Sequence, residues 1–307
     1  ALRRRAPLIT AAVFAAALVA GMLFSALYMH VHTLHEQRDA HALAVEHAAA
    51  IEERLNRSLS ATHAIAAVLR EGGGRIADFD ALASETLRLY GGLSSLQLAP
   101  GGVVSTVVPY VGNADAIGHD LLNDPQRSAE ARLAIETRRL TLAGPLITRQ
   151  GEQAVIARLP VFLNGADGHE AFWGFSIAVI GVDALLAEAG LERLAQQGFH
   201  YQLAYTAMAE GRERAFAASE AAQFRQPVVH GFDVPNGRWH LTLEPVQGWL
   251  EREIWVATGA ASLLLALLAA ALAHALLRTP LMLLRKVNER TRALQEANRR
   301  MQNEIEE

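Results

Sequence analysis

The chain has 307 residues, of which 51% are apolar and 20% are charged, with no cysteine and a formal net charge of −4. This composition excludes collagen-like, intrinsically disordered and disulfide-stapled proteins, and its slightly acidic balance argues against a nucleic-acid partner. The mean hydropathy of +0.14 is high for a soluble chain with this many charges, so the apolar residues must be concentrated in particular segments. The length allows one or two domains of about 100–200 residues each.

Two long uncharged segments, 6–29 and 254–277, predict transmembrane helices near the two ends of the chain. At about 1.5 Å of rise per residue, each is long enough to cross a hydrocarbon layer of roughly 30 Å. The first exceeds the apolar stretch of about 7–15 residues in a cleaved signal peptide, so we expect an uncleaved anchor rather than a removed signal or a buried core helix.

Basic residues flank both segments on the side of the chain ends: Arg3, Arg4, Arg5, Arg278, Arg285 and Lys286. Cytoplasmic flanks of membrane helices carry an excess of arginine and lysine. The sequence therefore predicts a protein of the bacterial inner membrane whose segments 1–5 and 278–307 are cytoplasmic and whose middle region is periplasmic. We expect an output domain to follow Glu307 in the complete protein.

Residues 30–71 predict a long stalk helix that continues out of the first membrane segment. This stretch has neither proline nor glycine and is rich in strong helix formers. Apolar or small side chains recur at spacings of three and four, namely Ile51, Leu55, Leu59, Thr62, Ile65 and Leu69. The glycine run at 72–74 predicts the end of the helix.

Residues 72–181 predict a small PAS-like α+β unit, an antiparallel sheet with helices on one side. In chain order we expect a helix at 79–90 capped by Asp78, a hairpin of strands 93–100 and 103–109, a helix at 126–139, a break at Gly144-Pro145, and strands at 153–162 and 171–180. Residues 182–253 predict a second, smaller PAS-like unit. Its expected elements are a helix at 182–197 and strands at 198–207, 213–218, 227–234 and 238–245, with a turn at Pro235-Asn236-Gly237.

The segment after the second membrane helix has a heptad pattern. Its a and d positions are Leu284, Val287, Thr291, Leu294, Asn298, Met301 and Ile305. An asparagine at an a position favours a parallel two-stranded coiled coil. The sequence thus predicts a homodimer joined at 278–307, with a short amphipathic helix that has no partner as the alternative.

The sequence predicts no catalytic residue, no metal site and no cofactor. Five histidines follow the first membrane segment, at positions His30, His32, His35, His41 and His47, but their spacing matches one helix face only loosely and favours a solvated helix over a metal site. His119 and Asp120 are chain neighbours that point to opposite faces of an extended segment, which argues against a catalytic pair.

Three polar residues predict a ligand site instead: Asp120, Thr148 and Arg158. On a central strand at 153–162, Arg158 shares a face with Ala154 and Ile156, where an arginine is costly unless it is paired. Two explanations stay open. Asp120 and Arg158 form a structural ion pair, or both contact one polar ligand in a largely apolar cavity.

Several elements of the sequence occur together in this order: the stretch VVSTVVPYVGNADAIGHDLLNDP, the short elements AGP and PVF, the element FWGF, and the ending NGRWHLTLEPVQGW. With these elements, the chain resembles bacterial CHASE domains over about residues 55–250. These are extracellular sensory modules of histidine kinases and nucleotide cyclases, with relatives in plant cytokinin receptors. The resemblance implies a long stalk helix, two PAS-like subdomains, dimerisation and a ligand in the membrane-distal subdomain.

In the cytokinin-binding members, three places contact the ligand. By the resemblance, the matching places in this chain are Asp120, the loop from Leu146 to Arg149 near Thr148, and Arg158, which stands where those receptors have a strand threonine. A guanidinium at that position suits an anionic or carbonyl-bearing ligand better than an adenine-type one.

The predicted function is therefore a transmembrane sensor that binds a small extracytoplasmic ligand and signals through the second membrane helix and the coiled coil to a histidine kinase or diguanylate cyclase. A membrane-anchored periplasmic enzyme with chemistry around His119, or a scaffold that binds another protein, is the alternative. A heptad segment on the cytoplasmic side favours the sensor, because an enzyme displayed outside the membrane does not need it.

Overall fold

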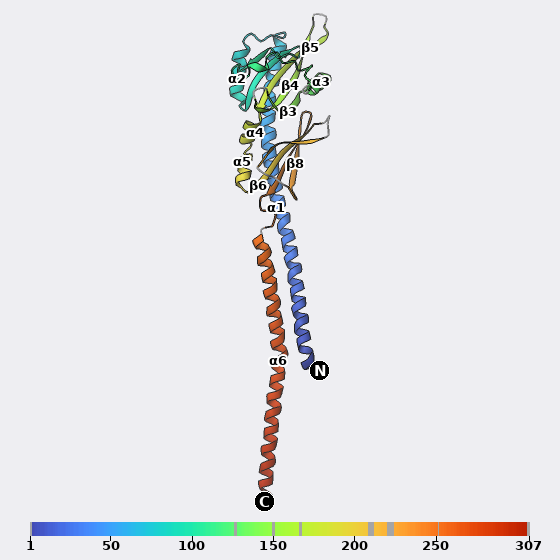
Figure 1. Cartoon of the computed structure of the whole chain (residues 1–307), viewed down its shortest axis with the longest axis vertical. Coiled ribbons are helices and arrows are strands. Elements are labelled where there is room, and N and C mark those ends of the chain that lie inside the picture. Colours follow the sequence, from blue (N-terminus) through green and yellow to red (C-terminus); the bar gives the residue numbers. More distant parts are fainter. Residues whose placement is uncertain are drawn as a thin grey trace. The chain divides into compact units, whose positions relative to one another are not determined.

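The computed structural model describes residues 2–125, 128–148, 151–165, 168–207, 212–219, 224–250 and 252–305. The chain forms two compact units: residues 1–36 with 247–307 make unit 1, and residues 37–246 make unit 2. The long helix α1, Leu2–Glu71, contributes to both units (Figure 1).

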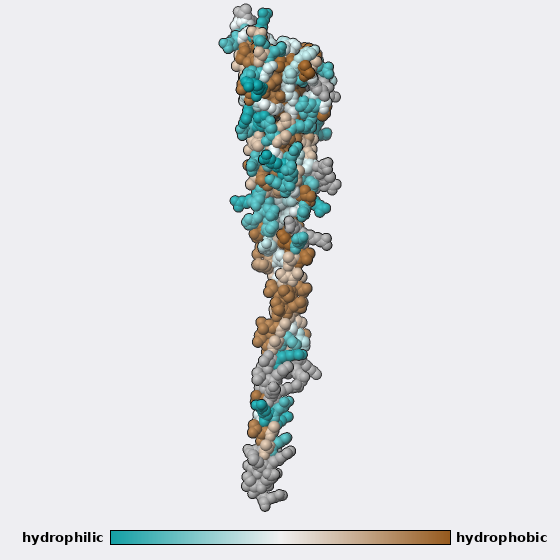
Figure 2. Space-filling view, turned by 90° about the vertical axis from the view of Figure 1, so that its left-hand side faces the viewer, coloured by the Kyte–Doolittle hydropathy of each residue, from teal (hydrophilic) through white to brown (hydrophobic). Residues whose placement is uncertain are grey.

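Unit 1 consists of the first part of α1 and the helix α6, Arg252–Ile305. Both helices contain segments long and apolar enough to cross a membrane, within Ala6–Glu71 and Glu253–Arg278. Apolar residues gather on the visible face of this part of the chain (Figure 2). Helix α6 continues through the predicted heptads. The heptad residues Val287 and Leu294 are exposed. Positions 306–307 lie outside the described residues.

The two helices of unit 1 pack through small side chains. A Cβ atom added to Gly21 would lie 2.9 Å from the Cβ of Ser262. Ser25 follows Gly21 by one turn, Ala266 follows Ser262 by one turn, and both are buried. Small residues four apart let helix backbones approach closely, which is how membrane helices associate where no hydrophobic effect drives them together.

We expect Gly21→Leu to separate these helices, because its side chain has no space beside Ser262. The chain has no cysteine, so the separation can be measured as bismaleimide cross-linking between cysteines introduced at Ser25 and Ser262. The yield should fall several-fold in Gly21→Leu and stay unchanged in the control Val19→Leu, at an exposed position. Equal yields in the two variants would contradict this packing.

The larger sheet of unit 2 has five antiparallel strands in the order β2-β1-β5-β4-β3. The strands are β1 Leu93–Pro100, β2 Thr106–Val108, β3 Thr141–Ile147, β4 Gln153–Asn164 and β5 Glu170–Gly181. The 3-10 turn η1, Ala114–Ala116, lies between β2 and α3. The break predicted at Gly144-Pro145 is wrong, because strand β3 continues through this dipeptide. The pairing of β3 with β4 only shifts its register between Ala143 and Leu146.

Helices cover both faces of this sheet, and not one side as the sequence suggested. Helices α1 and α2, Phe79–Tyr90, share a buried cluster with alternate residues of β1, β4 and β5. Helix α3, Ser128–Thr137, places Ala131 and Ala134 against Phe175 and Ile177 on the opposite face. The cap of α2 is as predicted, with the Asp78 carboxylate accepting a hydrogen bond from the Ala81 amide at 2.9 Å.

The smaller sheet has four strands in the order β7-β6-β9-β8. These are β6 Phe199–Ala207, β7 Glu213–Ala218, β8 Val228–Val234 and β9 Gly237–Pro245. The helical segment before them is two short helices, α4 Val182–Glu188 and α5 Leu191–Gln196, instead of one. They separate at Gly190, which adopts a left-handed conformation with φ of 70°.

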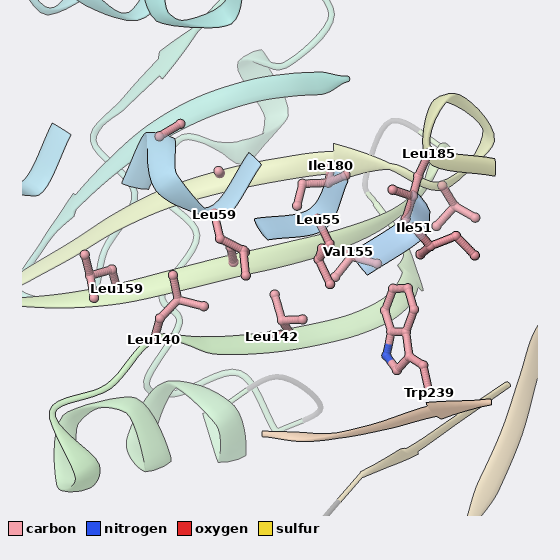
Figure 3. Packing of buried hydrophobic residues seen from close by; sticks show 14 of the residues in the cluster. Ile51, Leu55, Leu59, Leu140, Leu142, Val155, Leu159, Ile180, Leu185 and Trp239 are labelled. Carbon is pink, nitrogen blue, oxygen red and sulfur yellow. The ribbon is translucent and has the colours of Figure 1, made fainter. Parts of the chain in front are cut away.

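One apolar core joins the stalk part of α1 to both sheets. Every residue of the stripe predicted from spacing, from Ile51 to Leu69, is buried. Figure 3 shows Ile51, Leu55 and Leu59 facing residues of the larger sheet, with Trp239 of β9 in the same cluster. The stalk is therefore a structural part of unit 2 and not a free rod.

A histidine pair connects the stalk to the smaller sheet. The rings of His41 on α1 and His230 on β8 meet edge to face with centroids 5.6 Å apart. Burial, followed by the nearby charges of His41 and Arg238, lowers the pKa of His230 below its ordinary value of 6.5, and Glu52 acts in the opposite direction.

His230 binds a proton less readily in the folded protein than in the unfolded chain. The folded state therefore loses stability relative to the unfolded state as the pH falls from 6.5 toward the lowered pKa of His230. We expect the melting temperature to drop between about pH 7.5 and about pH 5.5, and to drop less in His230→Gln. A fluorescence melting series across pH measures this, with His63→Gln on the exposed face of α1 as the control. Identical pH profiles for wild type and His230→Gln would contradict the assignment.

Candidate functional site

A pocket lies on the face of the five-stranded sheet opposite α1. Its cavity volume is about 40 Å³, so the surrounding residues must move apart to admit an organic ligand. The described residues that line it are Gln97, Asn113, Ala116, His119, Leu121, Thr148, Glu152, Ile156, Arg158, Ile177 and Val179. Six of these eleven residues are polar or charged and five are apolar, a mixed lining that suits a small molecule with both polar and apolar parts.

The floor of the pocket follows from strand alternation. Gln97 on β1 pairs with Ile177 on β5, and Ile177 pairs with Arg158 on β4, so these three side chains lie in one row across the sheet. Val179 and Ile156 form the neighbouring row. The intervening residues of β4, such as Ala157, face the stalk. The predicted sharing of one face by Ile156 and Arg158 is thus confirmed.

The roof is the loop that runs from Pro109 to Asn123. Backbone hydrogen bonds attach it to the turn between β1 and β2: the Val104 amide donates to the His119 carbonyl at 3.0 Å, and the Gly118 amide donates to the Val104 carbonyl at 2.8 Å. The Leu121 amide likewise donates to the Gly102 carbonyl at 2.9 Å. These bonds hold alternate side chains of the loop, His119 and Leu121, over the sheet.

The rim is the turn between β3 and β4. The Thr148 amide donates to the Glu152 carbonyl at 2.8 Å, and the Glu152 amide donates to the Thr148 hydroxyl at 3.2 Å. The Glu152 carboxylate accepts a hydrogen bond from the Ser94 hydroxyl at 2.9 Å. This turn therefore presents a hydroxyl and a carboxylate to the pocket mouth. Arg149, the last residue of the predicted contact loop, lies outside the described residues.

Arg158 is the main source of charge in the pocket. Its side chain is fully buried, with 0% exposure, in a row that includes the apolar Ile177. A guanidinium keeps its charge at any physiological pH and presents a planar fork of donors. Because Arg158 has no exposed surface, a ligand can contact it only after residues around it move.

Asp120 is oriented away from this floor and is not among the described residues that line the pocket. Its carboxylate accepts hydrogen bonds from the Asn123 side chain at 2.8 Å and from the Leu122 and Asn123 amides at 3.0 and 3.1 Å. The Asn123 side chain, then these amides, hold the pKa of Asp120 below its ordinary value, against the opposing effect of burial. The structure thus brings Thr148 and Arg158 together, and gives Asp120 the role of stabilising the roof loop.

His119 takes the position in the pocket that the sequence suggested for its neighbour. Its Nε2 atom lies 2.8 Å from a carboxylate oxygen of Asp124, and its side chain is 11% exposed. An ionised carboxylate only accepts hydrogen bonds, so the proton is on Nε2 and Nδ1 is the ring nitrogen left for another partner. The carboxylate that pairs with His119 is therefore that of Asp124, directly after the roof loop, and not that of Asp120.

Gln97, Asn113, His119 and Glu152 are pocket residues that we did not predict. For Gln97 the sequence contained a usable signal: Ser95 and Gln97 are polar residues two apart in an otherwise apolar strand, so they lie on one face of the sheet. A polar residue on a buried sheet face requires polar partners, which points to a polar site there. Gln97 satisfies this by donating to the Ser95 hydroxyl at 3.2 Å. Within the described part of the chain, no three metal-ligating side chains converge.

The sequence pattern of the CHASE domain matches residues 30–216, which is more than half of the chain. The chain therefore belongs to the CHASE domain family, and this membership supports a role as an extracellular sensory receptor. None of the curated proteins matches the chain.

Several solved structures resemble the chain at low sequence identity. An extracellular ligand binding receptor from Desulfohalobium retbaense is 15% identical with a TM-score of 0.47, over 70% of this chain and 40% of that one. Methyl-accepting chemotaxis protein X is 15% identical with a TM-score of 0.46, over 70% of this chain and 98% of that one. The LuxQ periplasmic domain from Vibrio cholerae is 13% identical with a TM-score of 0.39, over 67% and 98%.

Proposed function

We propose that this chain is the sensory part of a homodimeric transmembrane receptor that binds a small extracytoplasmic ligand in the pocket above Arg158. The observation that carries the proposal is the pocket itself, which a fully buried arginine, Thr148 and His119 line together with apolar residues and three further polar side chains. In this proposal Thr148 and Arg158 contact the ligand, and Asp120 acts by holding the roof loop.

The fold offers a route from the pocket to the membrane. The sheet that forms the pocket floor packs by its other face on α1, and α1 belongs to the same core as the smaller sheet. A ligand that binds one arrangement of the roof loop and sheet more tightly than another shifts the population toward that arrangement. We propose that residues 72–181 are the membrane-distal subdomain that binds the ligand and that residues 182–253 are the membrane-proximal subdomain that relays the change.

On the cytoplasmic side, the proposed relay is the heptad segment at 278–307. Helix α6 extends without a break from the second candidate membrane segment through these heptads, which supports a direct mechanical link. A parallel pair of such segments from two copies would form the coiled coil, in the bacterial inner membrane with both termini cytoplasmic. The proposed output is a histidine kinase or a diguanylate cyclase.

A chimeric receptor tests this function. The chain is joined through its heptads to the catalytic half of a histidine kinase that controls a reporter gene, and cells are exposed to small-molecule fractions of culture medium. We expect a fraction that changes reporter output. The pocket-filling variant Ile177→Trp should abolish the response, and Leu89→Trp at an exposed site on α2 should keep it. A response that survives Ile177→Trp, or an output that no fraction changes, would contradict the proposal.

A further inference from the structure

The charges around the pocket differ in their depth. Arg158 lies at the floor with no exposed surface, His119 lies in the roof, and the exposed Glu152 lies at the rim. Among the described residues that line the pocket, these are the three that can carry charge. The positive charge is therefore deepest, and the negative charge stands at the entrance.

The chemistry of the floor matches a carboxylate. A guanidinium binds a carboxylate through two parallel hydrogen bonds, and such charge-assisted bonds are about twice as strong as neutral ones. Two strands away in the same row, on the other side of Ile177, the amide of Gln97 provides a further polar group. The remaining floor is apolar, with Ile156, Ile177 and Val179.

The roof adds a second polar contact. Because Asp124 engages Nε2 of His119 at 2.8 Å, the imidazole has a defined orientation and its Nδ1 atom is the one that can contact a ligand. His119 and Arg158 line the same small pocket, so one small ligand can contact both.

We propose that the ligand of this pocket is a small monocarboxylate with an apolar body, its carboxylate bound by Arg158 and its far end contacted by His119. This inference rests on the proposed function, of which it names the ligand class. Glu152 makes the pocket select against dicarboxylates and phosphorylated compounds, because a second negative group would lie near the carboxylate at the rim.

The test compares charged and neutral compounds of equal shape on the full chain in lipid nanodiscs. Isovalerate and isovaleramide differ by the carboxylate alone, and benzoate and benzamide form a second such pair. We expect the two carboxylates to raise the melting temperature and the two amides to leave it unchanged. Succinamate should bind a few-fold more tightly than succinate, and Glu152→Gln should remove that difference.

Two variants locate the contacts. Arg158→Met should weaken isovalerate binding by about 100-fold or more, since it removes one partner of a buried charge pair. His119→Ala should weaken it several-fold, because it removes the side chain that contacts the apolar end of isovalerate and leaves the floor intact. The comparison of carboxylate with amide uses the wild-type chain and stays decisive even where Arg158→Met does not fold.

Equal stabilisation by isovalerate and isovaleramide, or stabilisation by neither carboxylate, would overturn the ligand class. Neither result would contradict the receptor function, because the response of the chimera to medium fractions tests that function independently. An Ile177→Trp variant that responds as the wild type does would overturn the receptor function, whatever the carboxylates do.

Discussion

Gly174→Ala is expected to lower the free energy of unfolding of unit 2 by about 2–6 kcal/mol, of which about 1–3 comes from backbone strain and about 1–3 from overpacking. Gly174 has φ of +152° in the middle of β5. A Cβ atom added there would collide with the carbonyl oxygen of Ala99 and would lie 2.7 Å from the Cα of Pro100. Both obstacles are backbone atoms of β1, which cannot rotate away as a side chain would.

A thermal melt of the full chain measures this effect, since each kcal/mol lowers the melting temperature of a unit of this size by about 2–4 °C. Gly101→Ala is the matched control: Gly101 has φ of +64° and nothing within 4 Å of an added Cβ, so it reports the cost of backbone strain alone. Equal melting temperatures for the two variants would show that β5 does not approach β1 this closely.

Trp239→Ala is expected to lower the free energy of unfolding of unit 2 by about 3–5 kcal/mol, the usual range for removing a large aromatic side chain from a core. Trp239 is 2% exposed, and its ring meets Phe216 at 5.0 Å and Phe232 at 6.0 Å between centroids. It belongs to the cluster that contains Ile51 of the stalk (Figure 3). Its loss therefore weakens the attachment of the smaller sheet to α1.

Chemical denaturation followed by circular dichroism measures the loss, with Leu89→Ala, at a side chain 69% exposed, as the control that should change stability little. Trp239→Phe should recover part of the stability, because it keeps an aromatic contact with Phe216. A Trp239→Ala variant as stable as Leu89→Ala would contradict the shared core.

The helices and most strands were predictable because each depends on local chemistry. The spacing of Ile51, Leu55 and Leu59 shows the buried face of the stalk, and the Asp78 cap begins α2 at the expected residue. Strand β3 was missed because Gly144-Pro145 usually ends an element, and only the neighbouring strand β4 holds it in the sheet. The placement of α3 on the other sheet face depends on tertiary packing of Ala131, which no local pattern indicates.

The candidate site was predictable where it lies on a strand and not where it lies on a loop. The two-residue period of β4 placed Arg158 on the correct face, because strand alternation is a geometric property of the backbone. The roof loop has no such period. Its conformation depends on hydrogen bonds to Gly102 and Val104 and on the turn that Asp120 makes with Asn123, so His119 and not Asp120 enters the pocket.

The central claim is that the pocket above Arg158 is where a signalling ligand binds. Hydrogen exchange of the full chain in nanodiscs, with and without the medium fraction that drives the chimera, tests it most directly. The account predicts slower exchange at the amides of Gly118 and Leu121 in the roof loop and at the Val104 amide that bonds to this loop, and no change there in Ile177→Trp. Protection confined to the four-stranded sheet, or equal protection in Ile177→Trp, would contradict it.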